Sequence, residues 1–165
     1  MTMPADRIDE ADELAAGPRA LAETLAAVAR GFGVETRVVV GAGEEGSVVG
    51  TMEGDDVEAL IGRGGQTIDA IQYLATQIVS RAEGGARRRV TVDAGGYRAR
   101  RAAALAELAE RAAREAVEYG EEIELDAMTP HDRRIVHLAL HDRTDVVTRS
   151  EGEEPRRRII VEPAE

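Results

Sequence analysis

Cysteine, tryptophan and lysine are absent from this sequence, and aromatic residues are scarce. The lack of cysteine excludes disulfides, thiolate nucleophiles and cysteine-based zinc sites, and it fits a reducing compartment. The aromatic residues are Phe32, Tyr73, Tyr97 and Tyr119. Four rings are too few for a sheet surface on which nucleic-acid bases stack.

Long hydrophobic runs are missing as well. No stretch approaches the roughly 20 apolar residues of a membrane span, and the first residues show no basic segment followed by an apolar one. We therefore expect a cytoplasmic protein that is neither exported nor inserted in a membrane. The chain has 165 residues, of which 43% are hydrophobic and 32% charged. This composition predicts one globular domain or two small ones.

Negative charge dominates the chain, but it is unevenly distributed. The formal net charge is −11, and all 21 basic residues are arginine. Residues 61–101 contain eight arginines against three acidic residues, whereas residues 33–60 contain one arginine against seven acidic residues. The middle of the chain is therefore a basic island, and its local field predicts partners better than the net charge does.

Apolar periodicity and glycine spacing predict the element order α-β-β-α-α-β, followed by α-β-α-β-β. This order is typical of a mixed α+β fold, in which a three-stranded sheet with packed helices is followed by a small α+β domain. We expect a flexible lead-in at 1–17, a first domain at 18–94 and a second at 95–163. The expected helices are 18–30, 57–61, 66–82, 97–119 and 130–140, and the expected strands are 34–40, 47–52, 90–92, 123–125, 145–150 and 157–161.

Four local patterns carry these helix assignments. Gly31 and Gly33 are expected to end the first helix, and Asp55 or Asp56 to cap the second. Thr129 is expected to cap the last helix, with Pro130 at its first position. One apolar stripe is predicted for the helix 66–82, made of Ile68, Ile71, Leu74, Ala75, Ile78 and Val79.

The most distinctive motif is the glycine-rich segment Gly62-Arg63-Gly64-Gly65 between two expected helices. Glycines at both ends let the backbone approach a ligand closely, because no side chain stands in the way. The helix that follows directs free backbone N–H groups at that point, which suits a phosphate, and Arg63 adds a full charge. A glycine-rich helix corner without a ligand is the competing interpretation.

A second basic stretch runs from Arg81 to Arg89 and includes Arg87 and Arg88. It is either a solvated loop between a helix and a strand or one wall of a nucleic-acid groove.

A further candidate site lies near the C-terminus. Arg133 and His137 are four residues apart, so they share a helical face with Arg134 beside them. The run Arg156-Arg157-Arg158 could add positive charge to that face. The competing interpretation is a histidine packed at a helix edge, together with solvated arginines.

Two other patterns resemble functional motifs but lack residues that those motifs need. Residues 41–46 form a Gly-x-Gly-x-x-Gly motif, but a strand rather than a helix is expected next, and Glu44 and Glu45 would repel a pyrophosphate. His137 and His141 share a helical face without the glutamate of the zinc-protease motif. We therefore expect no catalytic residues, no metal and no cofactor.

The segment from Ile61 through Gly62–Gly65, Gln66, Thr67 and Ile68 to Leu74 resembles the signature of a type II KH domain, in particular that of the bacterial Jag family. Residues 128–140, followed by 150–158, resemble the R-3-H domain of the same family. The two matches cover about residues 33–162 in the family's order. Gly64 stands where family members usually carry a second basic residue, and we expect the family's N-terminal domain and charged linker to be missing.

The resemblance implies a non-enzymatic protein that binds single-stranded RNA, and single-stranded DNA as well through its C-terminal half. It implies a post-transcriptional role linked to cell elongation and division. The KH loop would hold phosphates, Arg81 and Arg87–Arg89 would support it electrostatically, and base edges would meet an apolar groove beside Ile61, Ile68 and Ile71. The alternative is an adaptor that pairs with a second small KH protein, with RNA binding secondary.

Overall fold

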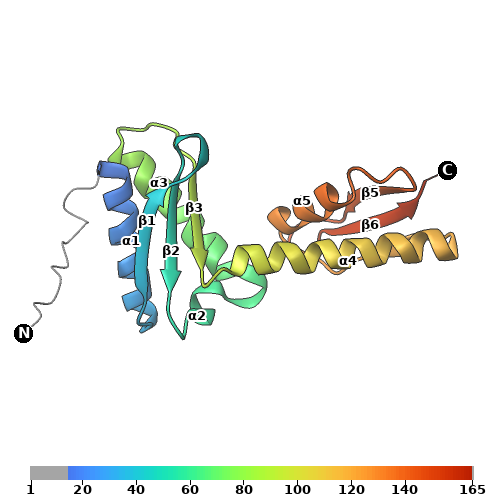
Figure 1. Ribbon diagram of the computed structural model, residues 1–165, viewed down its shortest axis with the longest axis horizontal. Coiled ribbons are helices and arrows are strands. Elements are labelled where there is room, and N and C mark those ends of the chain that lie inside the picture. Colours follow the sequence, from blue (N-terminus) through green and yellow to red (C-terminus); the bar gives the residue numbers. More distant parts are fainter. Residues whose placement is uncertain (1–14, 165) are drawn as a thin grey trace, which may run out of the picture. The chain divides into compact units, whose positions relative to one another are not determined.

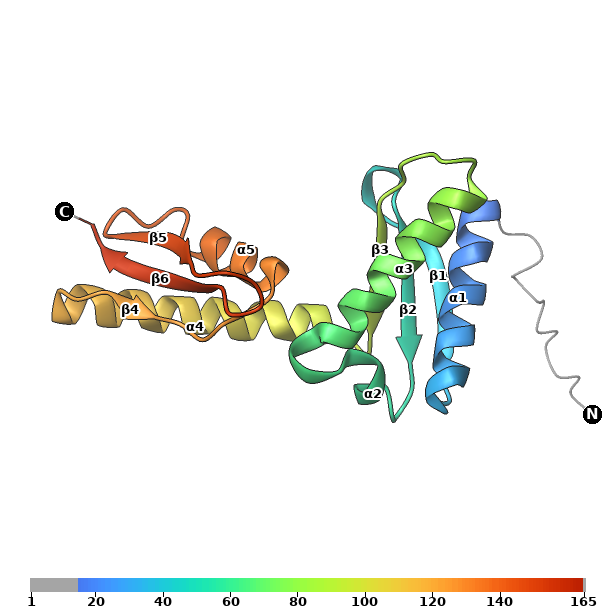
Figure 2. The same ribbon diagram turned by 180° about the vertical axis from the view of Figure 1, so that it is seen from behind.

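The computed structural model describes residues 15–164. The expected lead-in therefore lies largely outside the described residues. The chain divides into two compact units, the first ending at Tyr97 and the second beginning at Arg98. Both units combine helices with a three-stranded sheet (Figures 1 and 2), so the predicted α+β class is confirmed.

The first unit is a sheet with two long helices on one face. Its elements are α1 (Ala16–Phe32), β1 (Arg37–Ala42), β2 (Val48–Glu53), α2 (Glu58–Ile61), α3 (Gln66–Ala82) and β3 (Val90–Ala94). Strand β2 pairs antiparallel with β1 and parallel with β3, with Val38 opposite Met52 and Val48 opposite Val90. Helices α1 and α3 pack side by side against this sheet (Figure 2). Their buried faces and the alternate strand residues form one core.

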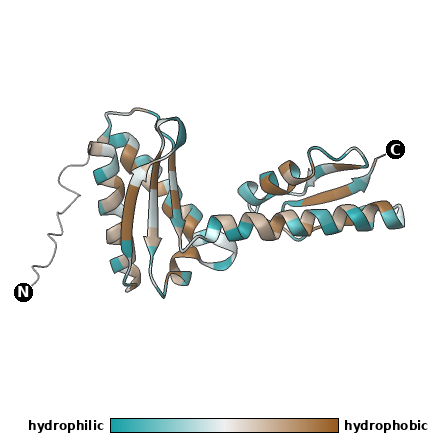
Figure 3. Cartoon of the chain, viewed as in Figure 1, coloured by the Kyte–Doolittle hydropathy of each residue, from teal (hydrophilic) through white to brown (hydrophobic). Residues whose placement is uncertain are grey.

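The second unit is a smaller sheet packed on two helices. It contains most of α4 (Tyr97–Tyr119), then β4 (Ile123–Glu124), α5 (Pro130–Ala139), β5 (Val146–Glu151) and β6 (Arg158–Pro163). Strand β6 lies between β4 and β5 and is antiparallel to both. The alanine-rich face of α4 packs against Ile159 and Val161 of β6. Figure 3 shows these apolar strands against the mixed surface of α4.

Several sequence predictions agree with these bounds. The helices at 66–82 and 97–119 match at both ends. Thr129 caps α5 by accepting a hydrogen bond from the Asp132 N–H, with Pro130 at the first position. Both helices and this cap are set by local hydrogen bonds, which explains why the sequence alone predicts them.

Other local predictions are wrong in part. Gly33 ends α1 as expected, as a left-handed C-cap, but the helix continues through Gly31 to Phe32. The N-cap of α2 is Val57 without a side-chain cap, not Asp55 or Asp56. The buried stripe of α3 is narrower than predicted, because Leu74 and Ile78 are 52% and 41% exposed. Helix α1 and the sheet cover only one side of α3, and these two residues project past that contact.

Candidate nucleic-acid interface

The loop Gly62–Gly65 joins α2 to α3 through a single 3-10 turn, Arg63–Gly65. Gly62 has φ 71° and ψ −179°, a conformation that is essentially restricted to glycine. A Cβ added to Gly62 would lie 2.0 Å from Thr67 Oγ1, and one added to Gly65 would lie 2.6 Å from Tyr97 Oη. The corner therefore requires glycine at both ends of the motif.

The tip of this loop is accessible. Arg63, Gly64 and Gln66 are exposed, and a Cβ added to Gly64 would meet no atom within 4 Å. Helix α3 begins directly after the turn, so its first backbone N–H groups point out of the helix end beside the Arg63 charge. An open backbone, a helix N-terminus and an arginine together make a site that can accept a phosphate.

The apolar residues expected to line a groove are in the core instead. The side chains of Ile61, Ile68 and Ile71 are 7%, 0% and 4% exposed and pack in the core of the first unit. They support the loop from the core side, because the apolar stripe of α3 faces the sheet. A groove beside them that receives base edges stays a prediction.

The second basic stretch lies at the opposite end of α3 from the glycine loop. Fifteen residues separate Gln66 from Arg81, which is about 22 Å of helix. Arg88 is paired with Glu83 at 2.6 Å and donates to the Gly46 carbonyl, and Arg89 lies 3.6 Å from Glu45. Arg81 and Arg87 are exposed. The structure therefore does not bring these arginines to the loop, and acidic neighbours neutralise two of them.

In the second unit, Arg133 is buried rather than displayed. Its side chain is 9% exposed, and its Nη1 donates to the Met128 carbonyl at 2.8 Å while its Nη2 contacts Glu154 Oε1 at 2.5 Å. Arg133 is therefore not an exposed cation on the α5 face that it shares with His137. Its burial depends on Glu154, which is 21 residues further along the chain.

His137 connects α5 to strand β5. Its Nδ1 lies 2.7 Å from Thr148 Oγ1 and its Nε2 lies 3.1 Å from Ser150 Oγ. Partial burial lowers the pKa of His137 below its ordinary value, and the positive charge of Arg133 lowers it further. The imidazole is therefore neutral at pH 7 and contributes hydrogen bonds rather than charge. Sequence reasoning missed Thr148 and Ser150, although strand alternation places both on one face.

This environment predicts a specific pH dependence. The unfolded chain binds a proton at His137 more readily than the folded chain, so stability is fully present above about pH 6.5 and declines as the pH falls through the unfolded pKa toward the lowered folded value. We expect the melting temperature of the wild type to fall more steeply between pH 7.5 and 5.5 than that of His137→Gln. Parallel curves for the two proteins would contradict this account of His137.

Several arginines of the second unit lie around or near His137. Pro130, Arg133, Arg134, His137, Leu138, Ser150 and Arg157 line a shallow pocket. Arg134, Arg156 and Arg157 are exposed, and within residues 15–164 their side chains have no acidic partner. These three arginines can meet a polyanion without first breaking an ion pair.

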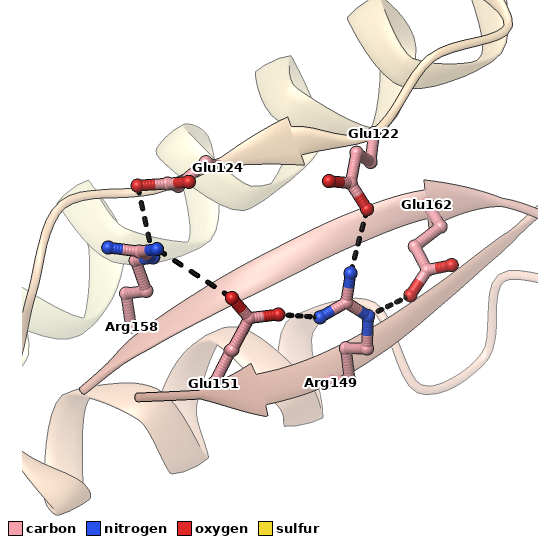
Figure 4. A network of polar contacts seen from close by, with 6 residues as sticks. All are labelled: Glu122, Glu124, Arg149, Glu151, Arg158 and Glu162. Atoms are coloured by element: carbon pink, nitrogen blue, oxygen red, sulfur yellow. Dashed lines mark hydrogen bonds and ion pairs between the residues drawn. The ribbon is translucent and has the colours of Figure 1, made fainter. Parts of the chain in front are cut away.

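Arg158 is not part of this group of unpaired arginines. It lies on the outer face of the sheet, where it contacts Glu124 at 3.0 Å and Glu151 at 3.7 Å. Figure 4 shows this network, in which Arg149 also contacts Glu122, Glu151 and Glu162. Arg158 begins β6, and strand alternation turns it away from the α5 side. The outer face is therefore acidic, with both arginines neutralised.

The described part of the chain holds no group of three or more histidine, aspartate or glutamate side chains that could bind a metal ion. No helix within residues 15–164 is both long and apolar enough to cross a membrane.

Comparisons with known proteins identify a known domain within the second unit. Residues 103–163 match the family model of the R-3-H domain, so the second unit contains an R-3-H domain. The chain is 41% identical over 110 residues to the RNA-binding protein KhpB of Clostridium symbiosum, which is 67% of this chain and 49% of that protein. It is 37% identical over 145 residues to the protein of the same name from Lactiplantibacillus plantarum, which is 87% of this chain and 44% of that protein. The chain thus spans about half the length of these relatives.

Proposed function

We propose that this chain, which carries an R-3-H domain at residues 103–163, is a non-enzymatic single-stranded RNA-binding protein of the Jag type. The observation that carries the proposal is a pair of accessible cationic sites, one in each unit. The first is the Gly62–Gly65 loop with Arg63, and the second is formed by Arg134 and Arg157 beside His137, with Arg156 next to Arg157 in the chain. The names of the relatives favour RNA as the polyanion.

The first unit supports a type II KH assignment for residues 18–94, with the R-3-H half at 95–163. Its elements follow the order α-β-β-α-α-β, and the Gly-x-x-Gly turn falls between the last two helices. In a KH domain this loop clamps the backbone of about four single-stranded nucleotides. Arg63 would contact a phosphate, and the N–H groups at the start of α3 would donate to a second phosphate oxygen.

The charge distribution restricts how RNA can bind. The outer face of the second sheet presents four glutamates against two arginines (Figure 4). With a net charge of −11, the rest of the chain repels additional RNA. Binding is therefore limited to a few phosphates at the two cationic sites.

Salt titration of a single-stranded RNA of about 12 nucleotides tests this proposal. We expect log affinity to fall with log salt at a slope that corresponds to roughly three to five phosphate contacts. A duplex of the same sequence should bind more weakly, because its backbone cannot enter the glycine loop. Fluorescence anisotropy measures both, and the absence of binding at low salt would refute the proposed function.

The cellular role that we propose follows from the same resemblance. The Jag resemblance favours a cytoplasmic post-transcriptional regulator linked to cell elongation and division. The second candidate function is an adaptor that pairs with a small KH protein, and the exposed residues Tyr73, Leu74 and Ile78 of α3 favour it. Exposed large apolar side chains clustered on one helix are typical of a contact surface for another protein.

A variant that no longer binds RNA distinguishes the two candidate functions. Asp at Gly62 or Gly65 is unsuitable, because a side chain there would collide with Thr67 or Tyr97. Arg63→Asp with Gly64→Asp changes the exposed tip instead. If cells with this variant keep their normal shape although the protein no longer retains RNA, the adaptor function is the primary one.

A further inference from the structure

Arg133 is the most completely satisfied arginine around the pocket. One guanidinium nitrogen donates to the Met128 carbonyl and another contacts the Glu154 carboxylate. The Arg133 side chain is 9% exposed, whereas that of Glu154 is 52% exposed. The guanidinium of this ion pair is therefore buried, and the Glu154 carboxylate lies between it and the solvent.

Both partners of Arg133 connect it to the loop that joins β5 to β6. Glu154 belongs to this loop, residues 152–157, which also carries Arg156 and Arg157. Met128 is attached to the same loop, because its N–H donates to the Arg157 carbonyl at 3.1 Å. A turn within the loop, from the Arg156 N–H to the Glu153 carbonyl at 2.8 Å, completes the arrangement. Arg133 thus links α5 to the loop at two points.

We propose that Arg133 is a positioning residue for the RNA site: through Glu154 and Met128 it holds the 152–157 loop so that Arg156 and Arg157 face the polyanion, and it does not itself bind a phosphate. The inference rests on the proposed function. A phosphate that reached Arg133 would have to displace Glu154, exchanging one charge-assisted hydrogen bond for another while leaving a carboxylate unpaired beside the phosphate.

The sign of the effect at Glu154 separates the possible roles of Arg133. If Arg133 holds the loop, Glu154→Gln weakens RNA binding, because the loop loses its attachment. If Arg133 is a phosphate ligand masked by Glu154, the same change strengthens binding, because the guanidinium becomes available. If the pair serves stability only, the melting temperature falls and the affinity of the folded protein does not change.

The experiment measures affinity and salt slope for the same short single-stranded RNA with the full chain, well below the melting temperature. We expect Glu154→Gln and Arg133→Gln each to weaken binding about three- to tenfold. The double variant should bind RNA with the same affinity as the single variant that binds less tightly, because both changes break the same contact. Arg157→Ala should lower the salt slope by about one contact. Arg133→Lys should not restore binding, because a lysine cannot reach Met128 and Glu154 in the fork geometry of arginine.

Glu151→Gln and Arg149→Gln are the matched controls, since they remove the same charges from an exposed ion pair on the acidic outer face. They should change affinity by less than about twofold. Stronger binding by Glu154→Gln but not by Glu151→Gln would overturn the positioning role, and so would an unchanged affinity in both Glu154→Gln and Arg133→Gln. If the wild type binds no RNA, the proposed function fails and this inference fails with it.

Discussion

Replacing Arg63 and Gly64 together by aspartate is expected to weaken the binding of single-stranded RNA at least tenfold, which is about 1.4 kcal/mol. The two carboxylates would stand at the exposed tip of the loop, where a phosphate is expected and where a Cβ on Gly64 meets no other atom. Gly64 has φ 60°, a left-handed conformation that aspartate tolerates better than most residues. The melting temperature should therefore fall by only a few degrees. Anisotropy with the short RNA and a thermal melt measure the two effects.

The matched control for this variant is Arg87→Asp with Gly84→Asp. It also replaces an exposed arginine and a left-handed glycine with open space around it, at φ 69°, but at the far end of α3. We expect its affinity to fall less than about threefold. If both double variants lose affinity equally, binding responds to net charge and the glycine loop is not a clamp.

Gly62→Ala is expected to have the largest effect on stability, about 2–4 kcal/mol of the free energy of unfolding. The new methyl group would lie 2.0 Å from Thr67 Oγ1, and alanine rarely adopts the backbone conformation of Gly62. Either α2 or the start of α3 must shift, and the packing of Leu60 and Ile68 shifts with them. Chemical denaturation of the full chain measures the loss.

Gly64→Ala serves as the control for this change. It also places a methyl group at a positive φ, but with no atom within 4 Å, so it should cost only about 1–2 kcal/mol. Equal losses at Gly62 and Gly64 would contradict the requirement for glycine at Gly62, because only Gly62 combines a glycine-restricted backbone conformation with the contact to Thr67.

Much of the architecture was predictable from the sequence, because the signals are local. Helices α3 and α4 match the expected bounds, and the Thr129–Pro130 cap begins α5 as predicted. The glycine motif is likewise readable, since Gly62 and Gly65 are needed for a turn of a few residues. In each case the hydrogen bonds join residues within about four positions, so composition and spacing contain the information.

The candidate site was only partly predictable. Arg134, Arg156 and Arg157 are exposed, and their contact with nucleic acid stays a prediction. Arg133 is buried against Glu154, and Arg158 lies in the acidic network on the outer face of the sheet. Sequence spacing placed Arg133 and His137 on one helix face, and both line the same pocket. It could not show that Glu154, from a distant loop, would cover one of them.

The sequence by itself determined where helices, strands and tight turns form, because short-range hydrogen bonds, glycine conformations and apolar periods are properties of neighbouring residues. Only the tertiary structure decided which side of each element is covered. It buried Ile68, exposed Leu74, and separated Arg81 from the glycine loop by the length of α3. It also paired Arg133 with Glu154. Burial and ion pairing depend on residues brought together from distant parts of the chain, so which arginines remain available to a polyanion is a property of the fold.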